Sequence, residues 1–343
     1  MIIYIYIFFI LTLIGFTTIL CFRKNNELYE RPVETVPGNP DLIISTLGYE
    51  NGFFSQFFFT INHYIYAKKH NKNFKLDTTK WLFKYKDGWT DYFKDIKLSY
   101  TNITKEPIKF GHSNNIYGAS IKEYESAIKD IYIYNEKTEE AILNAKKKLN
   151  LLNRKYNSIF IRRGDKLANE SDLIAGSMYI NVLSAKDKEC KIVYLQTDDY
   201  GCYLELQEYN KTNNLNLEII TLCEPTSRGS INNMHNKNLL VNMEGHRHGN
   251  RDHIKNNIDF IKDSKTLTEM TPQEMYKHTL DMLIGIDILA NSNMCVLDYQ
   301  SNVSRFIKLF HKNPKNVFDI ENPNSEWDYN MIHNLADYTN FYR

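Results

Sequence analysis

Short apolar segments alternate with helical stretches through the second half of the chain, and this alternation constrains the fold more than any other feature. The apolar segments have the length and the β-branched composition of buried strands. They lie at 158–161, 192–196, 217–222 and 294–297. Helices are expected between and after them at 177–185, 201–209, 272–290 and 302–311. Such alternation is typical of a doubly wound parallel sheet, in which ligands bind beyond the carboxyl ends of the strands.

The first half of the chain predicts a second α/β lobe. A strand at 42–46 leads through a glycine turn into an aromatic helix at 53–69. A short strand follows at 74–76, and a long helical stretch rich in Glu and Lys, 121–149, is expected to close this lobe.

The N-terminal residues 2–22 carry no charge and are numerous enough to cross a membrane as one helix. They lack the basic start and small-residue cleavage site of a signal peptide, so we expect a permanent anchor and no second span. Arg23 and Lys24 follow the segment, and by the positive-inside tendency they favour a cytosolic body. Glycosylation triplets favour a lumenal body instead, which leaves the orientation open. These triplets begin at Asn102, Asn169, Asn210 and Asn302.

The boundaries between segments follow from these patterns and from a proline-containing polar stretch after the anchor. We expect a membrane anchor at 1–22, a stem at 23–40, an N-terminal α/β lobe at 41–155, a C-terminal lobe at 156–313 and a tail at 314–343.

Composition excludes several classes of protein. The chain is 43% hydrophobic, which is too apolar for wholesale disorder. Its 42 Lys and Arg residues balance 41 Asp and Glu residues, and a net charge of +1 argues against bulk binding to nucleic acid. The 5 cysteines are an odd number and lack the spacing of a zinc site, so neither a structural zinc nor a disulfide framework is expected. A single disulfide bond is compatible with the sequence.

The segment IFIRRGDK (159–166) carries the sharpest chemical signal. A buried strand ends directly in Arg162, Arg163, Asp165 and Lys166. Two guanidinium groups and an ammonium at a strand end are suited to binding phosphate. A surface charge cluster in a loop is the plain alternative.

Two further strands also end in polar residues. The strand at 192–196 is followed by Asp198 and Asp199, which could bind a metal or a ribose, or cap the next helix. The strand at 294–297 is followed by Ser301 and Asn302, either of which could cap a helix whose N-terminus attracts phosphate. Three such strand ends at one edge of a sheet together favour a nucleotide or sugar-phosphate site.

In this order, the motifs resemble those of the α1,6-fucosyltransferases (glycosyltransferase family 23). The segment IFIRRGDKLANE is similar to the family's His-Val-Arg-Arg-x-Asp-Lys motif, whose Glu four residues after the Lys is Glu170 here. A family Tyr nine residues further on matches Tyr179. VYLQTDD resembles the second motif, and residues 301–303 stand where the family has Ser-Gln-Val.

The first lobe carries weaker parts of the same resemblance. Gly52 and Gln56 fit the family's glycine turn, and Trp81 with the pair Gly88 and Trp89 fits its Trp…Gly-Gly-Trp segment. The resemblance therefore covers roughly residues 45–310.

The resemblance implies a GT-B-like fold of two Rossmann-like lobes, with the nucleotide on the C-terminal lobe and the acceptor on the N-terminal lobe. It implies inverting, metal-independent transfer of L-fucose from GDP-fucose to O6 of a GlcNAc residue in a glycan or glycoconjugate, with no cofactor. By the same resemblance, Arg162 binds the β-phosphate and Glu170 is the general base, assisted by Lys166. The remaining expected nucleotide contacts are Arg163, Asp165, Tyr179, Asp198, Asp199, Ser301, Asn302, Val303 and Gly52.

Two departures from the family pattern concern the base of the donor. The family's guanine-binding His is Phe160 here, and its guanine-binding Asp falls on Gly285. These departures favour another nucleotide sugar or an inactive glycan-binding protein. A related transferase that forms an α1,2- or protein O-fucosyl linkage is a further alternative. Together with the predicted membrane anchor, the resemblance to fucosyltransferases predicts a Golgi or ER enzyme whose catalytic body is lumenal.

Overall fold

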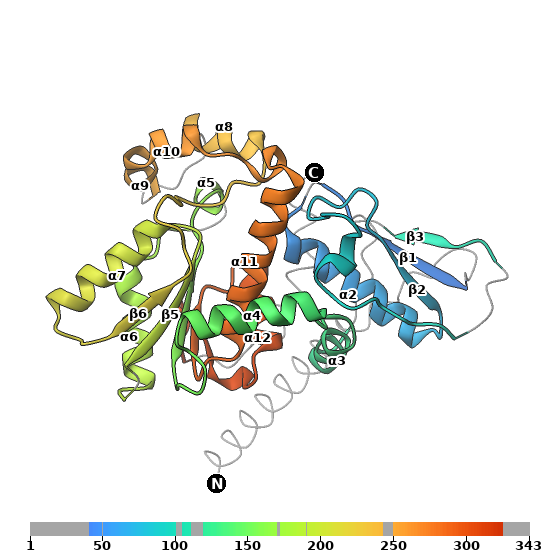
Figure 1. Cartoon of the computed structure of the whole chain (residues 1–343), viewed down its shortest axis with the longest axis horizontal. Coiled ribbons are helices and arrows are strands. Elements are labelled where there is room, and N and C mark those ends of the chain that lie inside the picture. Colours follow the sequence, from blue (N-terminus) through green and yellow to red (C-terminus); the bar gives the residue numbers. More distant parts are fainter. Residues whose placement is uncertain are drawn as a thin grey trace, which may run out of the picture.

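The computed structural model describes residues 41–49, 51–100, 105–110, 119–169, 172–189, 191–242 and 250–324. Within these residues the chain forms two α/β lobes, each built on a parallel sheet (Figure 1). The smaller sheet has the strand order β2-β1-β3 and the larger sheet the order β6-β5-β4-β7-β8. The predicted α/β class with two parallel sheets is therefore confirmed.

The smaller lobe begins with the strand β1, which pairs in parallel with β2 and β3. The helix α2 packs on β1 and β2 and buries most of its aromatic side chains. Gln56 ties the entry of this helix to the strand, because its Oε1 accepts a hydrogen bond from the Gly48 N–H (2.7 Å) and its Nε2 donates to the Asn51 carbonyl (2.6 Å). The elements of this lobe are β1 (Leu42–Thr46), α2 (Phe53–Lys69), β2 (Asn73–Asp77) and β3 (Ile108–Phe110).

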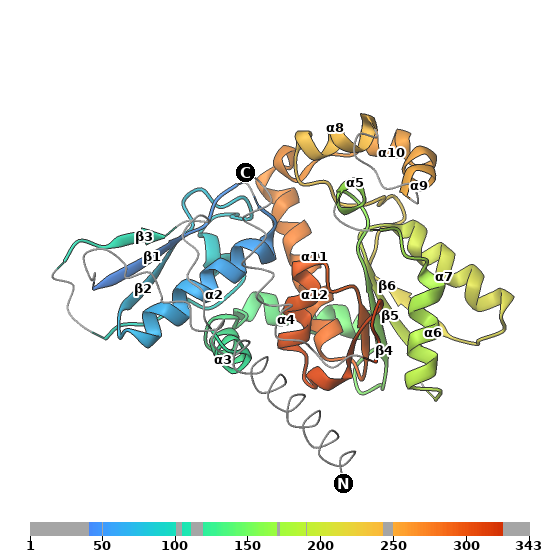
Figure 2. The same cartoon turned by 180° about the vertical axis from the view of Figure 1, so that it is seen from behind.

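The larger lobe has β4 at the centre of its sheet, with β5 and β7 on either side. Its strands are β4 (Asn157–Ile161), β5 (Ile192–Thr197), β6 (Glu218–Thr221), β7 (Cys295–Leu297) and β8 (Val317–Asp319). Figure 2 shows α6 and α7 on the outer face of this sheet and α11 and α12 between the sheet and the smaller lobe. These helices are α6 (Gly176–Lys186), α7 (Tyr200–Thr212), α11 (Pro272–Ala290) and α12 (Asn302–Phe310).

The predicted helical stretch at 121–149 contains two helices. The stretch 121–149 forms α3 (Ile121–Ile131) and α4 (Glu136–Lys148). The chain leaves the helical conformation at Tyr132 (ψ 65°), and the Asn135 side chain starts α4 by accepting a hydrogen bond from the Thr138 N–H (2.9 Å). The helix α4 packs against α11.

The predicted end of the larger lobe at 313 is too early. The strand β8 pairs in parallel with β7, with Val317 opposite Cys295, so residues up to Asp319 belong to the sheet. The sequence analysis also missed three short polar helices at the top of this lobe in Figure 1. They are α8 (Met234–Asn242), α9 (Arg251–Asn256) and α10 (Ile258–Asp263).

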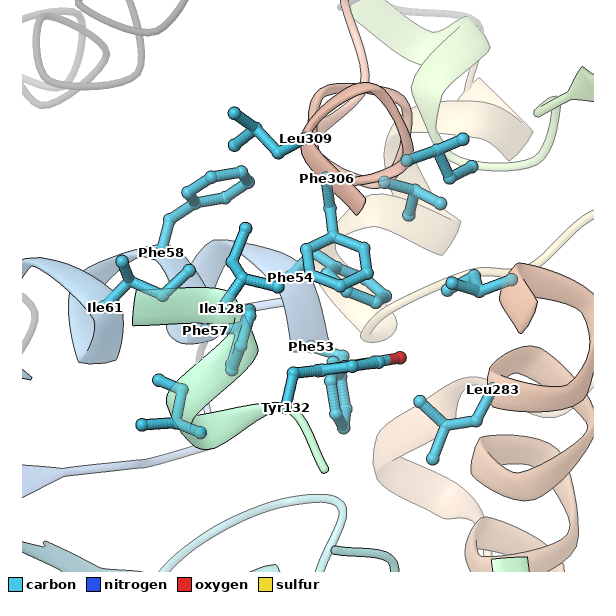
Figure 3. Close-up of a cluster of buried hydrophobic side chains, with 14 of the residues drawn as sticks. Phe53, Phe54, Phe57, Phe58, Ile61, Ile128, Tyr132, Leu283, Phe306 and Leu309 are labelled. Atoms are coloured by element: carbon cyan, nitrogen blue, oxygen red, sulfur yellow. The ribbon is translucent and has the colours of Figure 1, made fainter. Parts of the chain in front are cut away.

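A single hydrophobic cluster, called the shared core below, joins the two lobes (Figure 3). Phe306 of α12 is fully buried in it, with its ring centroid 4.6 Å from that of Phe54 and 4.6 Å from that of Tyr132. Side chains of α2, α3, α11 and α12 all contribute. The labelled members are Phe53, Phe54, Phe57, Phe58, Ile61, Ile128, Tyr132, Leu283, Phe306 and Leu309.

The predicted anchor at 2–22 and the stem at 23–40 lie outside the described residues. In the part of the chain that the structure describes, none of the helices combines the length and the apolar character needed to span a membrane. The anchor therefore stays a prediction.

Candidate functional site

Two glycines, Gly164 in the turn after β4 and Gly229 in a later loop, allow the backbones of these two segments to pack directly against each other. Gly164 has φ +59°, and a Cβ built on it would lie 2.3 Å from the carbonyl oxygen of Ser230. Gly229 has φ +105°, and its Cβ would lie 2.4 Å from the Cα of Gly164. The close approach allows the Asp165 N–H to donate to the Ser230 carbonyl (3.1 Å). A side chain at either glycine would separate the two segments.

Replacing Gly164 with Ala is expected to lower the free energy of unfolding by about 2 kcal/mol or more, because Ala is strained at positive φ and clashes with Ser230. Denaturant unfolding of both proteins measures this. Gly48, whose Cβ would meet nothing within 4 Å, is the matched control, and its Ala variant should stay close to wild type. Equal stability of the two variants would contradict the role of the Gly164 contact.

Two carboxylates fasten this turn to the loop at 229–232. Asp198 accepts hydrogen bonds from the Arg163 N–H (2.8 Å) and the Ser230 N–H (3.0 Å). Asp165 accepts from the Asn232 N–H (3.0 Å) and from Nδ2 of Asn236 (2.9 Å). Both carboxylates therefore fix the position of the residues that follow β4.

The pKa values of the two carboxylates shift in opposite directions. Burial raises the pKa of Asp198 more than the nearby Arg162 and its backbone hydrogen bonds lower it. Burial also acts on Asp165, but the charges of Arg162 and Lys166 and the hydrogen bonds to Asn236 and Asn232 outweigh it and lower its pKa. Asp165 is thus held as the anionic partner of the cations beside it.

Arg163, Asp199 and Tyr179 were expected to bind nucleotide, and the structure places them in contacts within the protein. The Arg163 guanidinium is buried and pairs with Glu205 (2.7 Å), a residue that the sequence analysis missed. Asp199 caps α7 by accepting a hydrogen bond from the Gly201 N–H (2.8 Å). Tyr179 is buried in the core between α6 and the sheet, which raises the pKa of its hydroxyl.

A pocket lies at the carboxyl ends of β4 and β7, where the parallel sheet predicts a ligand site. One side comes from β4 and the turn after it, and the other from β7 and the start of α12. Arg162 and Lys166 bring two cations to it, and Arg162 is oriented by an ion pair with Asp165 (3.0 Å) while its side chain stays 27% exposed. The lining residues are Phe160, Arg162, Lys166, Asp298, Gln300, Ser301 and Ser304.

The N-terminus of α12 reaches this pocket. Ser301 is the N-cap, and its Oγ accepts a hydrogen bond from the Val303 N–H (3.3 Å). Asn302 accepts a hydrogen bond from Arg305 (3.3 Å), and the Val303 side chain is buried in the shared core. The free N–H groups and the dipole of such a helix end attract anions. Ser301 is the one of these three predicted residues that lines the pocket.

Two titratable groups near the cations were not predicted as site residues. Asp298 lines the pocket, and burial, with Asp319 and Glu321 adding to the effect, raises its pKa to about 6. His278 of α11 is kept neutral, because burial and the Arg162 charge lower its pKa to about 4. Asp298 directly follows the predicted strand at 294–297, but an acid at a strand end does not by itself indicate that it lines a pocket.

A further predicted site residue, Gly52, does not line the pocket. Gly52 lies at the start of α2 in the smaller lobe, where its carbonyl accepts the first helical hydrogen bond from the Gln56 N–H (3.2 Å). Glu170, the predicted general base, lies outside the described residues.

Gly285 contacts a side chain that explains why a glycine stands there. It lies in the middle of α11, and a Cβ on it would lie 2.0 Å from Oε1 of Gln196 on β5. The Gln196 amide, which accepts a hydrogen bond from the Tyr194 hydroxyl, therefore occupies the space that a larger residue at 285 would need.

Among the described ranges, no group of three or more His, Cys, Asp and Glu side chains is arranged to hold a metal ion.

No family model matches the sequence, and no curated protein is similar to it in sequence. Among solved structures, the chain is similar to NodZ α1,6-fucosyltransferase soaked with GDP-fucose, with a TM-score of 0.50, 10% identity and coverage of 83% of this chain and 97% of that chain. A structure of NodZ from Bradyrhizobium has a TM-score of 0.49 at 10% identity and the same coverage. A mutant of Arabidopsis thaliana FUT1 in complex with GDP has a TM-score of 0.46 at 8% identity, over 84% of this chain and 72% of that chain.

The likeness to the first of these structures defines the fold as the two-lobed α/β fold of a solved α1,6-fucosyltransferase. The resemblance predicted from the sequence motifs is thereby confirmed at the level of the fold.

Proposed function

We propose that the protein is a glycosyltransferase that transfers L-fucose from GDP-fucose to a hydroxyl group of a glycan acceptor with inversion. One observation carries the proposal: two cations and a helix N-terminus line one pocket at the carboxyl ends of parallel strands. The fold supports it, because a solved structure with this fold is described as an α1,6-fucosyltransferase soaked with GDP-fucose. O6 of GlcNAc is the acceptor atom that the motif resemblance favours.

The residues of the pocket suit the charge that develops during this reaction. As the glycosidic bond breaks, negative charge accumulates on the departing diphosphate and needs a fixed partner. Arg162 is the partner we propose, because Asp165 orients its guanidinium and Lys166 adds a second charge beside it. Glu170 accepts the proton of the acceptor hydroxyl in this proposal.

A donor screen tests the proposal. The full chain, purified in detergent, is incubated with GDP-fucose, GDP-mannose, UDP-GlcNAc or UDP-galactose, with chitin oligosaccharides or N-glycans as acceptors, and nucleotide release is measured. We expect release from GDP-fucose that requires an acceptor and is lost in Arg162→Ala. Absence of release and of binding for every donor would overturn the proposal in favour of an inactive glycan-binding protein.

The alternative that specific contacts favour is that the donor is a nucleotide sugar other than GDP-fucose. Phe160 lines the pocket where the family motif has a histidine, and Gln196 packs on Gly285 where the motif has an aspartate. Acceptor-dependent release from a nucleotide sugar other than GDP-fucose would select this alternative.

We also propose that residues 2–22 anchor the protein in a Golgi or ER membrane with the catalytic body in the lumen. The uncharged run supports this, because its length matches the hydrocarbon thickness of a bilayer. After alkaline carbonate extraction, the full-length protein should stay with the membranes. Protease added to sealed vesicles should leave the body intact. Release of full-length protein by carbonate would rule out the anchor.

A further inference from the structure

The pocket is lined by groups whose hydrogen-bonding capacity a diphosphate alone would not satisfy. Arg162, Lys166 and the start of α12 are suited to phosphate oxygens, which accept hydrogen bonds. Asp298 lines the same pocket. When its carboxylate is ionised, it can accept hydrogen bonds but cannot donate them. An acid beside a phosphate site is unfavourable unless the ligand also supplies hydrogen-bond donors.

Ser304 is a second group that points to a ligand. Its side chain is fully buried on α12 and lines the pocket, and no partner within the described residues hydrogen-bonds its Oγ. A buried hydroxyl without a partner is costly and uncommon, so its place in a pocket wall indicates a group that binds there.

Local hydrogen bonds hold the segment that carries these groups. Asp298 Oδ1 accepts a hydrogen bond from the Gln300 N–H (2.9 Å), which turns the chain toward the Ser301 cap. Gln300 also lines the pocket, and its Nε2 donates to Glu321 (3.3 Å). The pocket-lining residues of the strand end and the first turn of α12 thus include an acid, an amide and a hydroxyl within one short stretch.

We propose that Asp298, Gln300 and Ser304 form a subsite for the hydroxyl groups of the donor sugar, next to the diphosphate bound by Arg162 and Lys166. This inference rests on the proposed function and adds the residues that recognise the sugar. Sugar hydroxyls donate hydrogen bonds to a carboxylate and accept them from a serine hydroxyl or an amide. The ligand class is therefore a sugar joined to a phosphate, not a free nucleotide.

The subsite has a consequence for the product. Once the sugar has been transferred, the Asp298 carboxylate faces the diphosphate without a hydroxyl to accept from. It therefore favours release of the nucleotide. Removing its charge should act in opposite directions on the two ligands: GDP should bind more tightly and GDP-fucose should be used less well.

The test compares Asp298→Asn with wild type in the full chain at pH 8, where the Asp298 carboxyl is ionised. By calorimetry, GDP affinity should rise about three- to tenfold, because a like charge has been removed. The kcat/KM for GDP-fucose should fall about ten- to a hundredfold, because a charged hydrogen-bond acceptor has been lost. Asp281→Asn, an exposed carboxylate of α11 that pairs with Lys277 (2.7 Å) and lines no part of the pocket, should change neither value more than about twofold.

Lowering the pH to 5 should bring the GDP affinities of wild type and Asp298→Asn together, because Asp298 is then protonated in wild type. Taking the ratio of the two affinities cancels the titration of the phosphate and of the unchanged side chains. Among the described residues, the charged or titratable groups around Asp298 are Arg162, Lys166, Tyr179, Arg305, Asp319 and Glu321.

Ser304→Ala keeps the inference testable if Asp298→Asn does not fold. It removes only the buried Oγ, so kcat/KM for GDP-fucose should fall about fivefold or more while GDP affinity stays within about twofold. The melting temperature without ligand should not decrease, because the hydroxyl had no partner among the described groups. Unchanged kcat/KM in this variant, or parallel effects of Asp298→Asn on GDP and GDP-fucose, would overturn the subsite. Absence of any GDP or GDP-fucose binding to wild type would instead overturn the proposed function on which it rests.

Discussion

Replacing Arg162 with Ala is expected to lower turnover at least a hundredfold and to weaken nucleotide binding. Arg162 follows a buried strand, lines the pocket and is held by Asp165 at 3.0 Å. Its orientation is thus set before the substrate arrives. Loss of one positioned donor to developing charge typically costs ~3 kcal/mol of transition-state stabilisation, or roughly a hundredfold in rate.

The Arg162→Lys variant separates charge from geometry. An ammonium keeps the charge but cannot form the two parallel hydrogen bonds of a guanidinium, so we expect only partial recovery of turnover and affinity. Calorimetry with GDP and transfer assays on the three proteins give both quantities. Full activity of Arg162→Ala would show that Arg162 does not face the departing phosphate.

Replacing Glu170 with Gln is expected to lower turnover by ~10²–10⁴-fold while nucleotide affinity stays within a few-fold of wild type. The amide keeps the shape of the side chain and removes its ability to accept a proton. The motif resemblance assigns this role to Glu170. The other acid of the same motif, Asp165, is buried and accepts hydrogen bonds from Arg162, Asn232 and Asn236, so it is poorly placed to deprotonate an acceptor.

The two variants therefore differ in a measurable way. Arg162→Ala should lose both GDP affinity and turnover, whereas Glu170→Gln should lose turnover alone. A pH profile adds a further check, because the base-dependent limb at low pH should disappear in Glu170→Gln. Wild-type turnover in this variant, or a loss of GDP affinity equal to that of Arg162→Ala, would reassign the base.

Elements with strong local signals could be predicted from the sequence to within a residue or two. The helix Pro272–Ala290 has both its apolar period and its start encoded locally: the Thr271 hydroxyl accepts from the Glu274 N–H (3.3 Å), the Glu274 carboxylate accepts from the Thr271 N–H (2.8 Å), and Pro272 fits the first turn. The strand Leu42–Thr46 and the helix Phe53–Lys69 likewise match their predicted ranges.

Elements defined by distant partners could not be predicted in this way. The strands Ile108–Phe110 and Val317–Asp319 are three residues each and exist because β1 and β7 offer them a free edge. Their length is too short to show a period of two.

The candidate site also combines features that local sequence could predict with features that depend on distant residues. A strand that ends in cations predicted a pocket at its carboxyl end, and the structure places one there. The sequence could not show which of the two adjacent arginines enters it, because that depends on Glu205 of α7, which binds the guanidinium of Arg163. Nor could it show that the Asp198 carboxylate accepts a hydrogen bond from the backbone N–H of Ser230, which lies in a loop later in the chain.

The helix α12 links the two lobes in a way that limits how they can move relative to each other. Its first turn forms a wall of the pocket, and one turn further on Phe306 is packed among Phe54, Phe57 and Tyr132. Hinge closure needs lobes that can rotate apart without breaking packed contacts. Here such a rotation would pull an aromatic ring out of the shared core. Substrate entry and product exit are therefore expected to depend on loop movements around a nearly fixed pair of lobes.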